Sequence, residues 1–216
     1  MNIPLPMAPQ DLSFDVTVNS NPRSGVDRRD ILENSEFGTV FTDHMVDICW
    51  SEKGGWHRPR VQPYGPIPMS PAAAVLHYGQ EIFEGLKAYR HDDGSIWMFR
   101  PEQNALRMQR SAARMALPEI PVEYFLQSLR ELISIDGDWV PGDSETSLYL
   151  RPFMFAKEEF LGVRPAKKVS FYVIASPVGP YFGGEVVPVS IWLSTRYARA
   201  GRGGTGAAKT GGNYAA

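Results

Sequence analysis

The sequence predicts an α+β fold in which two amphipathic helices cover a mostly antiparallel sheet. Residues 46–51 alternate between apolar and polar or small side chains, which is the pattern of a half-buried strand. Residues 92–94 (Asp-Asp-Gly) separate two strand-like segments and are typical of a hairpin turn. After Pro101, and again after Pro121, apolar residues recur at spacings of three and four, as they do on one face of a helix. Together these elements make an α+β domain.

The other expected elements follow in chain order. Residues 1–35 are polar and rich in proline, so we expect them to wrap over the surface. Residues 53–55 (Lys-Gly-Gly) are expected to form a turn between the first strand and a second strand around Val61. Ser70 and Pro71 indicate the start of a short helix, because serine is a preferred N-cap and proline suits the first helical position. Strands are further expected in residues 83–90, 95–99, 147–155, 169–175 and 187–193.

The composition limits the classes of protein to which the chain can belong. Hydrophobic residues make up 43% of the sequence, enough for a folded core, and the net charge of −2 gives no general attraction to nucleic acid or anionic membranes. The single cysteine, Cys49, rules out an internal disulfide framework, and we expect it to be buried in a strand. The histidines are scattered, so no metal site is expected. No apolar run reaches about 18 residues and the N-terminus does not resemble a secretory signal, which favours a cytoplasmic location.

The most informative segment is GRGGTGAAKTGGNYAA at residues 201–216, in which small residues surround Lys209 and Tyr214. Small neighbours let a flat cofactor ring approach the backbone, as a lysine that attacks a carbonyl group requires. A flexible glycine-rich tail with an incidental lysine is the alternative, and composition does not decide between the two. A P-loop does not fit, because two alanines separate Gly206 from Lys209. A dinucleotide-binding glycine motif also fits poorly, since no strand leads directly into Gly201.

Six segments, taken in chain order, carry a resemblance to a known family. They are FGTVFTDHM, LHYGQEIFEGLKAYR, FRPEQNALRMQRSAARM, SLYLRPFMFA, VGPYFGG and GAAKTGGNY. In these segments the chain resembles the branched-chain amino acid aminotransferases, which are fold-type IV enzymes that use pyridoxal 5′-phosphate (PLP). The combination of IFEGLKAYR with KTGGNY favours this family over the D-amino acid aminotransferase and aminodeoxychorismate branches of the same fold.

The resemblance implies transfer of an amino group between leucine, isoleucine or valine and 2-oxoglutarate. Lys209 matches the lysine that bonds covalently to PLP and then moves a proton during the transfer. Tyr214 matches the tyrosine whose hydroxyl binds the phenolic oxygen of the cofactor, and Arg107 matches the arginine that binds its phosphate. Helical periodicity alone would assign Arg107, with Arg110 and Arg114, to a solvated face.

The resemblance also implies a set of residues that line the substrate pocket: Phe37, Tyr78, Phe83, Tyr149, Arg151 and Tyr181. Aromatic walls suit a branched aliphatic side chain, which needs shape and apolar contact rather than a charged partner. Arg151, with Tyr78 and Tyr149, would hold the α-carboxylate. The family tyrosine matched by Tyr78 is donated across a dimer interface, so the resemblance implies a homodimer.

The implied organisation is a surface extension at residues 1–35, a small α+β domain at 36–176, a connector at 177–185 and the beginning of a larger cofactor-binding domain at 186–216. Family members continue past the segment that KTGGNY matches, and the further part holds the acid that faces the pyridine nitrogen. Glu84 is not expected to replace this acid. We therefore expect the N-terminal portion of an aminotransferase, inactive by itself. Two alternatives stay open: another fold-type IV enzyme, such as a D-amino acid aminotransferase or a lyase, and a non-catalytic fragment that folds or dimerises.

Overall fold

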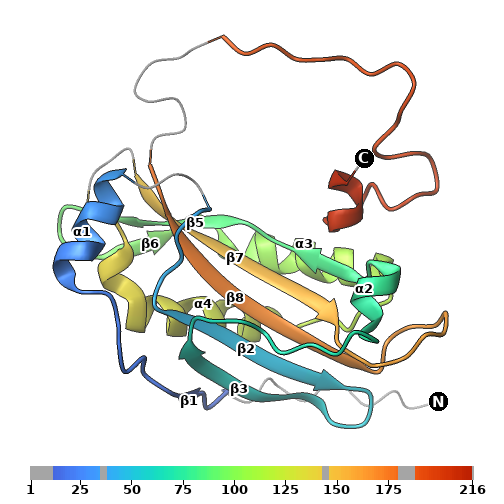
Figure 1. Cartoon of the computed structure of the whole chain (residues 1–216), viewed down its shortest axis with the longest axis horizontal. Coiled ribbons are helices and arrows are strands. Elements are labelled where there is room, and N and C mark those ends of the chain that lie inside the picture. The colour runs from blue at the N-terminus through green and yellow to red at the C-terminus, as the bar shows by residue number, and fades with distance from the viewer. Residues whose placement is uncertain (1–11, 35–37, 143–145, 180–187, 216) are drawn as a thin grey trace.

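The structure, a computed structural model, describes residues 12–34, 38–142, 146–179 and 188–215. Its strands form one sheet, and two long helices, α3 (Pro101–Arg114) and α4 (Val122–Asp136), pack against one face of that sheet (Figure 1). The α+β class expected from the sequence is confirmed. None of the helices in the described ranges is long and apolar enough to cross a membrane.

The remaining elements are shorter. In chain order they are β1 (Asp15–Val16), α1 (Gly25–Asn34), β2 (His44–Ser51), β3 (Gly55–Pro63), α2 (Ala74–Tyr78), β4 (Glu81–Phe83), β5 (Leu86–Arg90), β6 (Ile96–Met98), the 3-10 turn η1 (Gly137–Trp139), β7 (Ser147–Ala156), β8 (Lys168–Val178) and the 3-10 turn η2 (Gly211–Tyr214).

The strands lie in the order β1-β3-β2-β8-β7-β5-β6, and β4 pairs with β7 beside β5. Within the described ranges every pairing is antiparallel except that of β1 with β3, so the expected mostly antiparallel sheet is confirmed. The expected hairpin at residues 92–94 is also confirmed, because His91 N donates a 2.9 Å hydrogen bond to Ser95 O between β5 and β6. The two central strands, β7 and β8, pair over ten residues and form a rigid platform.

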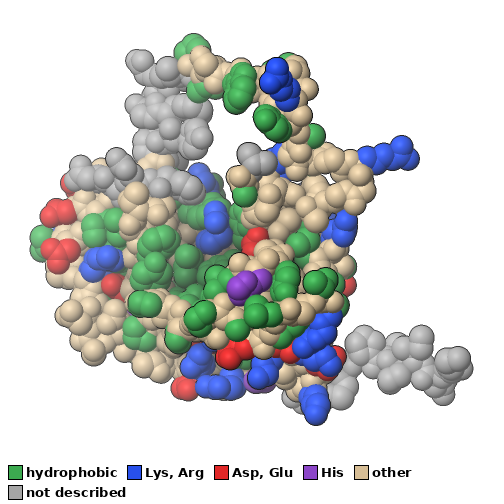
Figure 2. All heavy atoms as spheres, turned by 45° about the vertical axis from the view of Figure 1, so that its right-hand side comes forward, with side chains coloured by type: hydrophobic (Ala, Val, Ile, Leu, Met, Phe, Trp, Pro, Cys, Tyr) green, Lys and Arg blue, Asp and Glu red, His purple; other side chains and the backbone are tan. Residues whose placement is uncertain are grey.

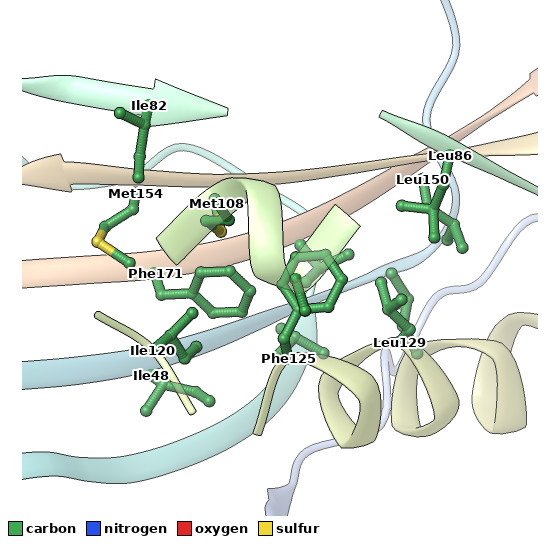
Figure 3. Close-up of a cluster of buried hydrophobic side chains, with 14 of the residues drawn as sticks. Ile48, Ile82, Leu86, Met108, Ile120, Phe125, Leu129, Leu150, Met154 and Phe171 are labelled. Carbon is green, nitrogen blue, oxygen red and sulfur yellow. The ribbon is translucent and has the colours of Figure 1, made fainter. Parts of the chain in front are cut away.

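Alternation along β7 separates the core from the opposite face of the sheet. Leu148, Leu150 and Met154 are fully buried between the sheet and the helices. Figure 3 shows Leu150 and Met154 among apolar side chains from the helices and the neighbouring strands. Tyr149 and Arg151 alternate with these residues, so they lie on the other face, where they are only half-buried. Tyr149 and Arg151 are therefore held by a packed core directly behind them.

Several expected boundaries are wrong. Helix α2 begins at Ala74, because the Ser70 hydroxyl accepts a 3.3 Å hydrogen bond from Ala72 N and closes a turn instead of capping a helix at Pro71. Strand β8 continues to Val178, so it takes in two residues that were assigned to the connector. Cys49 lies in β2 as expected but is half-buried rather than buried.

Two further differences have clear physical causes. Helix α1 was not expected from its polar sequence, but Ser24 Oγ accepts a 3.1 Å hydrogen bond from Asp27 N and so caps its N-terminus. The strand expected at 187–193 does not form in its described part, residues 188–193. Apolar residues such as Trp192, which is 88% exposed, have no neighbouring strand there, and alternation alone supplies no partner for the backbone.

Candidate active site

Lys209 and Tyr214 lie side by side at the C-terminal end of the described chain. Turn η2 brings them together, and Lys209 Nζ donates a 3.2 Å hydrogen bond to the Tyr214 hydroxyl. Lys209 Nζ is also 4.4 Å from the centre of the Phe83 ring, which itself lies 5.4 Å from the Tyr214 ring. An amine, a phenol and an aromatic wall thus meet at one point, as a site for a flat electrophilic ring requires.

The segment that carries Lys209 is held by β4 and α3. Its backbone is clamped from two sides, because Phe83 N donates to Lys209 O (3.0 Å) and Lys209 N donates to Ser111 Oγ (2.9 Å). Asn213 is 3% exposed, and its Nδ2 donates to Thr205 O (3.0 Å) and Ala208 O (2.8 Å). These bonds fix the loop, so the interpretation of residues 205–214 as a flexible glycine-rich tail does not hold.

One stripe of α3 contacts the C-terminal segment. Arg107, Ser111 and Arg114 lie four and three residues apart, which places them on the same side of the helix. Ser111 binds Lys209 N, and Arg114 Nη2 donates to Gly203 O (3.1 Å) and Gly204 O (2.9 Å). Arg114 is exposed, but its guanidinium is bound to the C-terminal segment and is not left to solvent alone.

Arg107 forms a bidentate ion pair with Glu84. Arg107 Nε donates to Glu84 Oε1 at 2.7 Å and Arg107 Nη2 donates to Glu84 Oε2 at 2.6 Å, while the carboxylate itself is fully buried. Asn104 Nδ2 adds a 2.9 Å bond to Glu84 Oε2. The hydrogen bond to Glu84 raises the pKa of the Arg107 guanidinium, burial opposes this, and the Glu84 charge, with Tyr214 and Tyr149, raises the pKa further. Arg107 is thus permanently cationic and lies near the Lys209–Tyr214 pair.

Arg151 joins the lysine site to an adjacent cavity. Its guanidinium lies 4.7 Å from the centre of the Phe83 ring, and Nη2 donates a 3.0 Å hydrogen bond to the Tyr149 hydroxyl. Both β7 residues also line a cavity of about 340 Å³, together with Gly38, Phe41, Ile174 and Ser176. Arg151 Nε is buried and has no hydrogen-bond partner in the described part of the chain. A buried donor of this kind suits an anionic ligand group.

Gly85 explains how Tyr149 reaches this position. A Cβ at Gly85 would stand 2.0 Å from the Tyr149 hydroxyl, so only glycine leaves room for the phenol. Figure 2 shows basic and hydrophobic side chains together below the C-terminal segment. No group of three or more potential metal ligands occurs among the described residues.

The structure brings together most of the site residues expected from the sequence: Lys209, Tyr214, Phe83, Tyr149 and Arg151, with Arg107 nearby. Tyr78 is 42% exposed at the end of α2, lies 6.3 Å from the Phe160 ring and lines a different pocket, which also includes Gln80. Its expected position at a dimer interface stays a prediction. Phe37 and Tyr181 lie outside the described residues.

Three residues of the site were not predicted from the sequence: Glu81, Glu84 and Ser111. Glu81 Oε1 accepts hydrogen bonds from Thr210 Oγ1 (3.1 Å) and from Gly211 N. Two spacings in the sequence were the available signals. Glu81 and Phe83 flank a buried strand residue, and Arg107 and Ser111 lie one helical turn apart. Neither spacing reveals the partners of Glu81 and Ser111, because these partners are more than 90 residues away in the chain.

No protein-family model matches the chain. The chain is 58% identical over 206 residues to "Branched-chain-amino-acid aminotransferase" from Mycolicibacterium smegmatis, an alignment that covers 95% of this chain and 56% of that protein. It is 55% identical over 211 residues to the protein of the same name from Mycobacterium tuberculosis, with coverage of 97% and 57%.

A solved structure gives the same result at the level of the fold. A T.th. branched-chain amino acid aminotransferase with pyridoxamine 5′-phosphate has a TM-score of 0.58 and 27% identity, and the match covers 77% of this chain and 52% of that chain. The sheet and its two covering helices have the fold of a fold-type IV aminotransferase. The sequence identity narrows the class, because over 95–97% of its length the chain is similar to part of proteins named branched-chain-amino-acid aminotransferases. It spans 56–57% of the length of the two relatives described above.

Proposed function

We propose that this protein transfers an amino group between a branched-chain L-amino acid (leucine, isoleucine or valine) and 2-oxoglutarate, with PLP bound through Lys209. The observation that carries the proposal is the 3.2 Å contact between Lys209 Nζ and the Tyr214 hydroxyl beside the Phe83 ring. The names of the relatives support the reaction class. The solved relative with pyridoxamine 5′-phosphate supports the cofactor.

The described residues fit this cofactor. Lys209 supplies an amine for the cofactor aldehyde, and Tyr214 supplies a hydroxyl for the phenolic oxygen next to that aldehyde. Arg107 supplies a cation for the phosphate: its bonds to Glu84 use Nε and Nη2, which leaves Nη1 for a phosphate oxygen. When bound, PLP supplies an electrophilic carbon for amines and a ring that withdraws electrons from the substrate Cα.

Lys209 would carry the proton that the reaction moves. As a free amine, Nζ can take a proton from the substrate Cα and return it at the cofactor carbon, acting first as base and then as acid. The hydrogen bond to Tyr214 orients Nζ, and the Phe83 ring covers it from one side and limits the access of water. The backbone bonds of Lys209 to Phe83 and Ser111 hold the chain while the side chain swings.

Arg151 and Tyr149 would bind the α-carboxylate of the substrate. The unpartnered Nε of Arg151 and the cavity of about 340 Å³ beside it support this assignment. The apolar side chains of Phe41 and Ile174 in the same cavity suit a branched aliphatic group. Substrates that share an α-carboxylate, such as leucine and glutamate, would share this contact.

We further propose that the protein is a cytoplasmic homodimer and that Tyr78 lies at the dimer interface. Light scattering of the purified protein tests whether it is a dimer.

The proposal is tested by steady-state turnover of the intact protein with PLP, L-leucine and 2-oxoglutarate, followed as formation of L-glutamate. Lys209→Ala is expected to abolish turnover, and Lys87→Ala, at an exposed position on β5, is the matched control and is expected to leave it unchanged. Turnover of D-amino acids in place of L-leucine would assign another fold-type IV activity. Absence of turnover in the intact protein would favour the non-catalytic alternative.

A further inference from the structure

Glu81 binds the two residues that directly follow Lys209. Its Oε1 accepts a 3.1 Å hydrogen bond from the Thr210 hydroxyl and a second one from Gly211 N, the first amide of turn η2. A Cβ on Gly211 would stand 2.5 Å from this oxygen, so the close approach depends on glycine at that position. The Thr210 side chain makes no capping hydrogen bond to η2. The Glu81 carboxylate on β4 caps this turn instead.

Strand β4 is a rigid support for these contacts. Glu81 and Phe83 lie on one face, while Ile82 between them is fully buried in the core. The strand pairs antiparallel with β7, where Ile82 lies opposite Met154. Phe83 binds Lys209 through both its backbone N–H and its ring, so one three-residue strand contacts residues 209, 210 and 211 in succession.

We propose that Glu81 is a positioning residue for Lys209. Its carboxylate fixes the backbone of Thr210 and Gly211, and this sets both the direction of the Lys209 side chain and the start of the turn that returns Tyr214 to Lys209 Nζ. The inference rests on the proposed function for its catalytic consequence. The placement of Lys209 by Glu81 can be measured without any cofactor.

The first experiment uses the protein without PLP. Glu81→Ala, Glu81→Gln and a control, Glu119→Ala at an exposed position, are compared by hydrogen exchange of the peptide that contains residues 209–214 and by competitive reductive methylation of Lys209. Exposed Lys87 in the same sample is the internal reference for methylation. Glu81→Ala is expected to speed exchange in this peptide at least tenfold and to change the Lys209/Lys87 methylation ratio. Glu81→Gln keeps an acceptor oxygen and is expected to restore both values to within about threefold.

The second experiment uses the protein with PLP and measures the single-turnover reaction with L-leucine. Displacing a catalytic group by about 1 Å can cost up to about a hundredfold in rate, so Glu81→Ala is expected to lower the first-order rate constant by about ten- to a hundredfold. Leucine affinity is expected to stay within about twofold, because Arg151 is not touched. Glu81→Gln is expected to recover most of the rate, a rescue that a nonspecific loss of stability would not show.

The outcomes separate this inference from the proposed function. If wild-type protein forms no covalent link with PLP, the proposed function fails, and the exchange and methylation data still decide the role of Glu81. If wild type turns over leucine and Glu81→Ala matches Glu119→Ala in exchange, methylation and rate, Glu81 does not position Lys209. A lower melting temperature for Glu81→Ala with an unchanged rate constant and methylation ratio would likewise overturn the inference.

Discussion

Removing the Arg107 side chain is expected to have two separable effects, one on stability and one on retention of PLP. Arg107→Ala leaves the fully buried Glu84 carboxylate without its bidentate partner, while Asn104 Nδ2 remains bound to it. Loss of one partner from a buried ion pair costs about 3–5 kcal/mol. Arg107 is itself 47% exposed and Asn104 keeps part of the solvation, so we expect about 2–3 kcal/mol. For a domain of this size, this corresponds to a fall in melting temperature of roughly 4–12 °C.

The second effect comes from the phosphate contact proposed for Arg107. Loss of one charge-assisted hydrogen bond costs about 1.5–3 kcal/mol, or roughly ten- to a hundredfold in affinity for PLP. Melting is followed by circular dichroism, and retention by absorbance after dialysis. Arg110→Ala is the matched control, because Arg110 lies on the same helix and is exposed. Arg114 is a poorer control, since it binds the carbonyl groups of Gly203 and Gly204.

A double variant separates the two effects. Glu84→Gln combined with Arg107→Ala removes the stranded charge, so it is expected to recover most of the lost stability and none of the lost PLP affinity. Recovery of both would mean that Arg107 acts on the cofactor site only by keeping Glu84 in place. Equal PLP retention in Arg107→Ala and Arg110→Ala would refute the phosphate contact.

Three more predictions follow from the same geometry. Arg151→Lys is expected to weaken leucine and glutamate half-reactions alike, since it keeps a charge and loses the planar fork; a loss confined to one substrate would show that Arg151 contacts the side chain instead. Gly85→Ala is expected to displace the Tyr149 ring and lower leucine affinity at least tenfold, whereas Gly65→Ala, with open space around its Cβ, is not. Burial raises the pKa of Tyr172 to about 12. The folded state therefore holds this proton more tightly than the unfolded state does. As a result, about 2–3 kcal/mol of the free energy of unfolding that is present below pH 10 is lost by about pH 12. In urea unfolding, Tyr172→Phe should show a smaller fall in the free energy of unfolding over that pH range.

Local patterns in the sequence were sufficient to predict those elements whose hydrogen bonds are made within the element or with the next element in the chain. The hairpin around residues 92–94 and helices α3 and α4 are of this kind. The strand expected at 187–193 failed in its described part because alternation records a preference for strand geometry and does not supply a paired neighbour. Helix α1 was missed for the opposite reason, since its cap at Ser24 is local but its few apolar residues gave no periodic signal.

Only part of the candidate active site could be predicted from the sequence. The family resemblance named Lys209 and Tyr214 as cofactor-binding residues, and the structure places their side chains in contact; their roles toward PLP stay predictions. The groups that hold Lys209 in place, Glu81 and Ser111, come from elements far away in the chain, and their partners depend on how β4 and α3 pack. Glu84 illustrates the same point: its burial beneath Arg107 is a property of the assembled sheet and helix.

The central claim is that Lys209 is the residue that bonds to PLP. The most direct measurement is reduction of the intact, PLP-treated protein with borohydride, followed by peptide mapping of the pyridoxyl label by mass spectrometry. We expect about one label per chain on Lys209, a yellow colour before reduction, and no label at that peptide in Lys209→Ala. Label on Lys53, Lys87, Lys167 or Lys168 in place of Lys209, or no label in an intact protein that still turns over leucine, would contradict the claim.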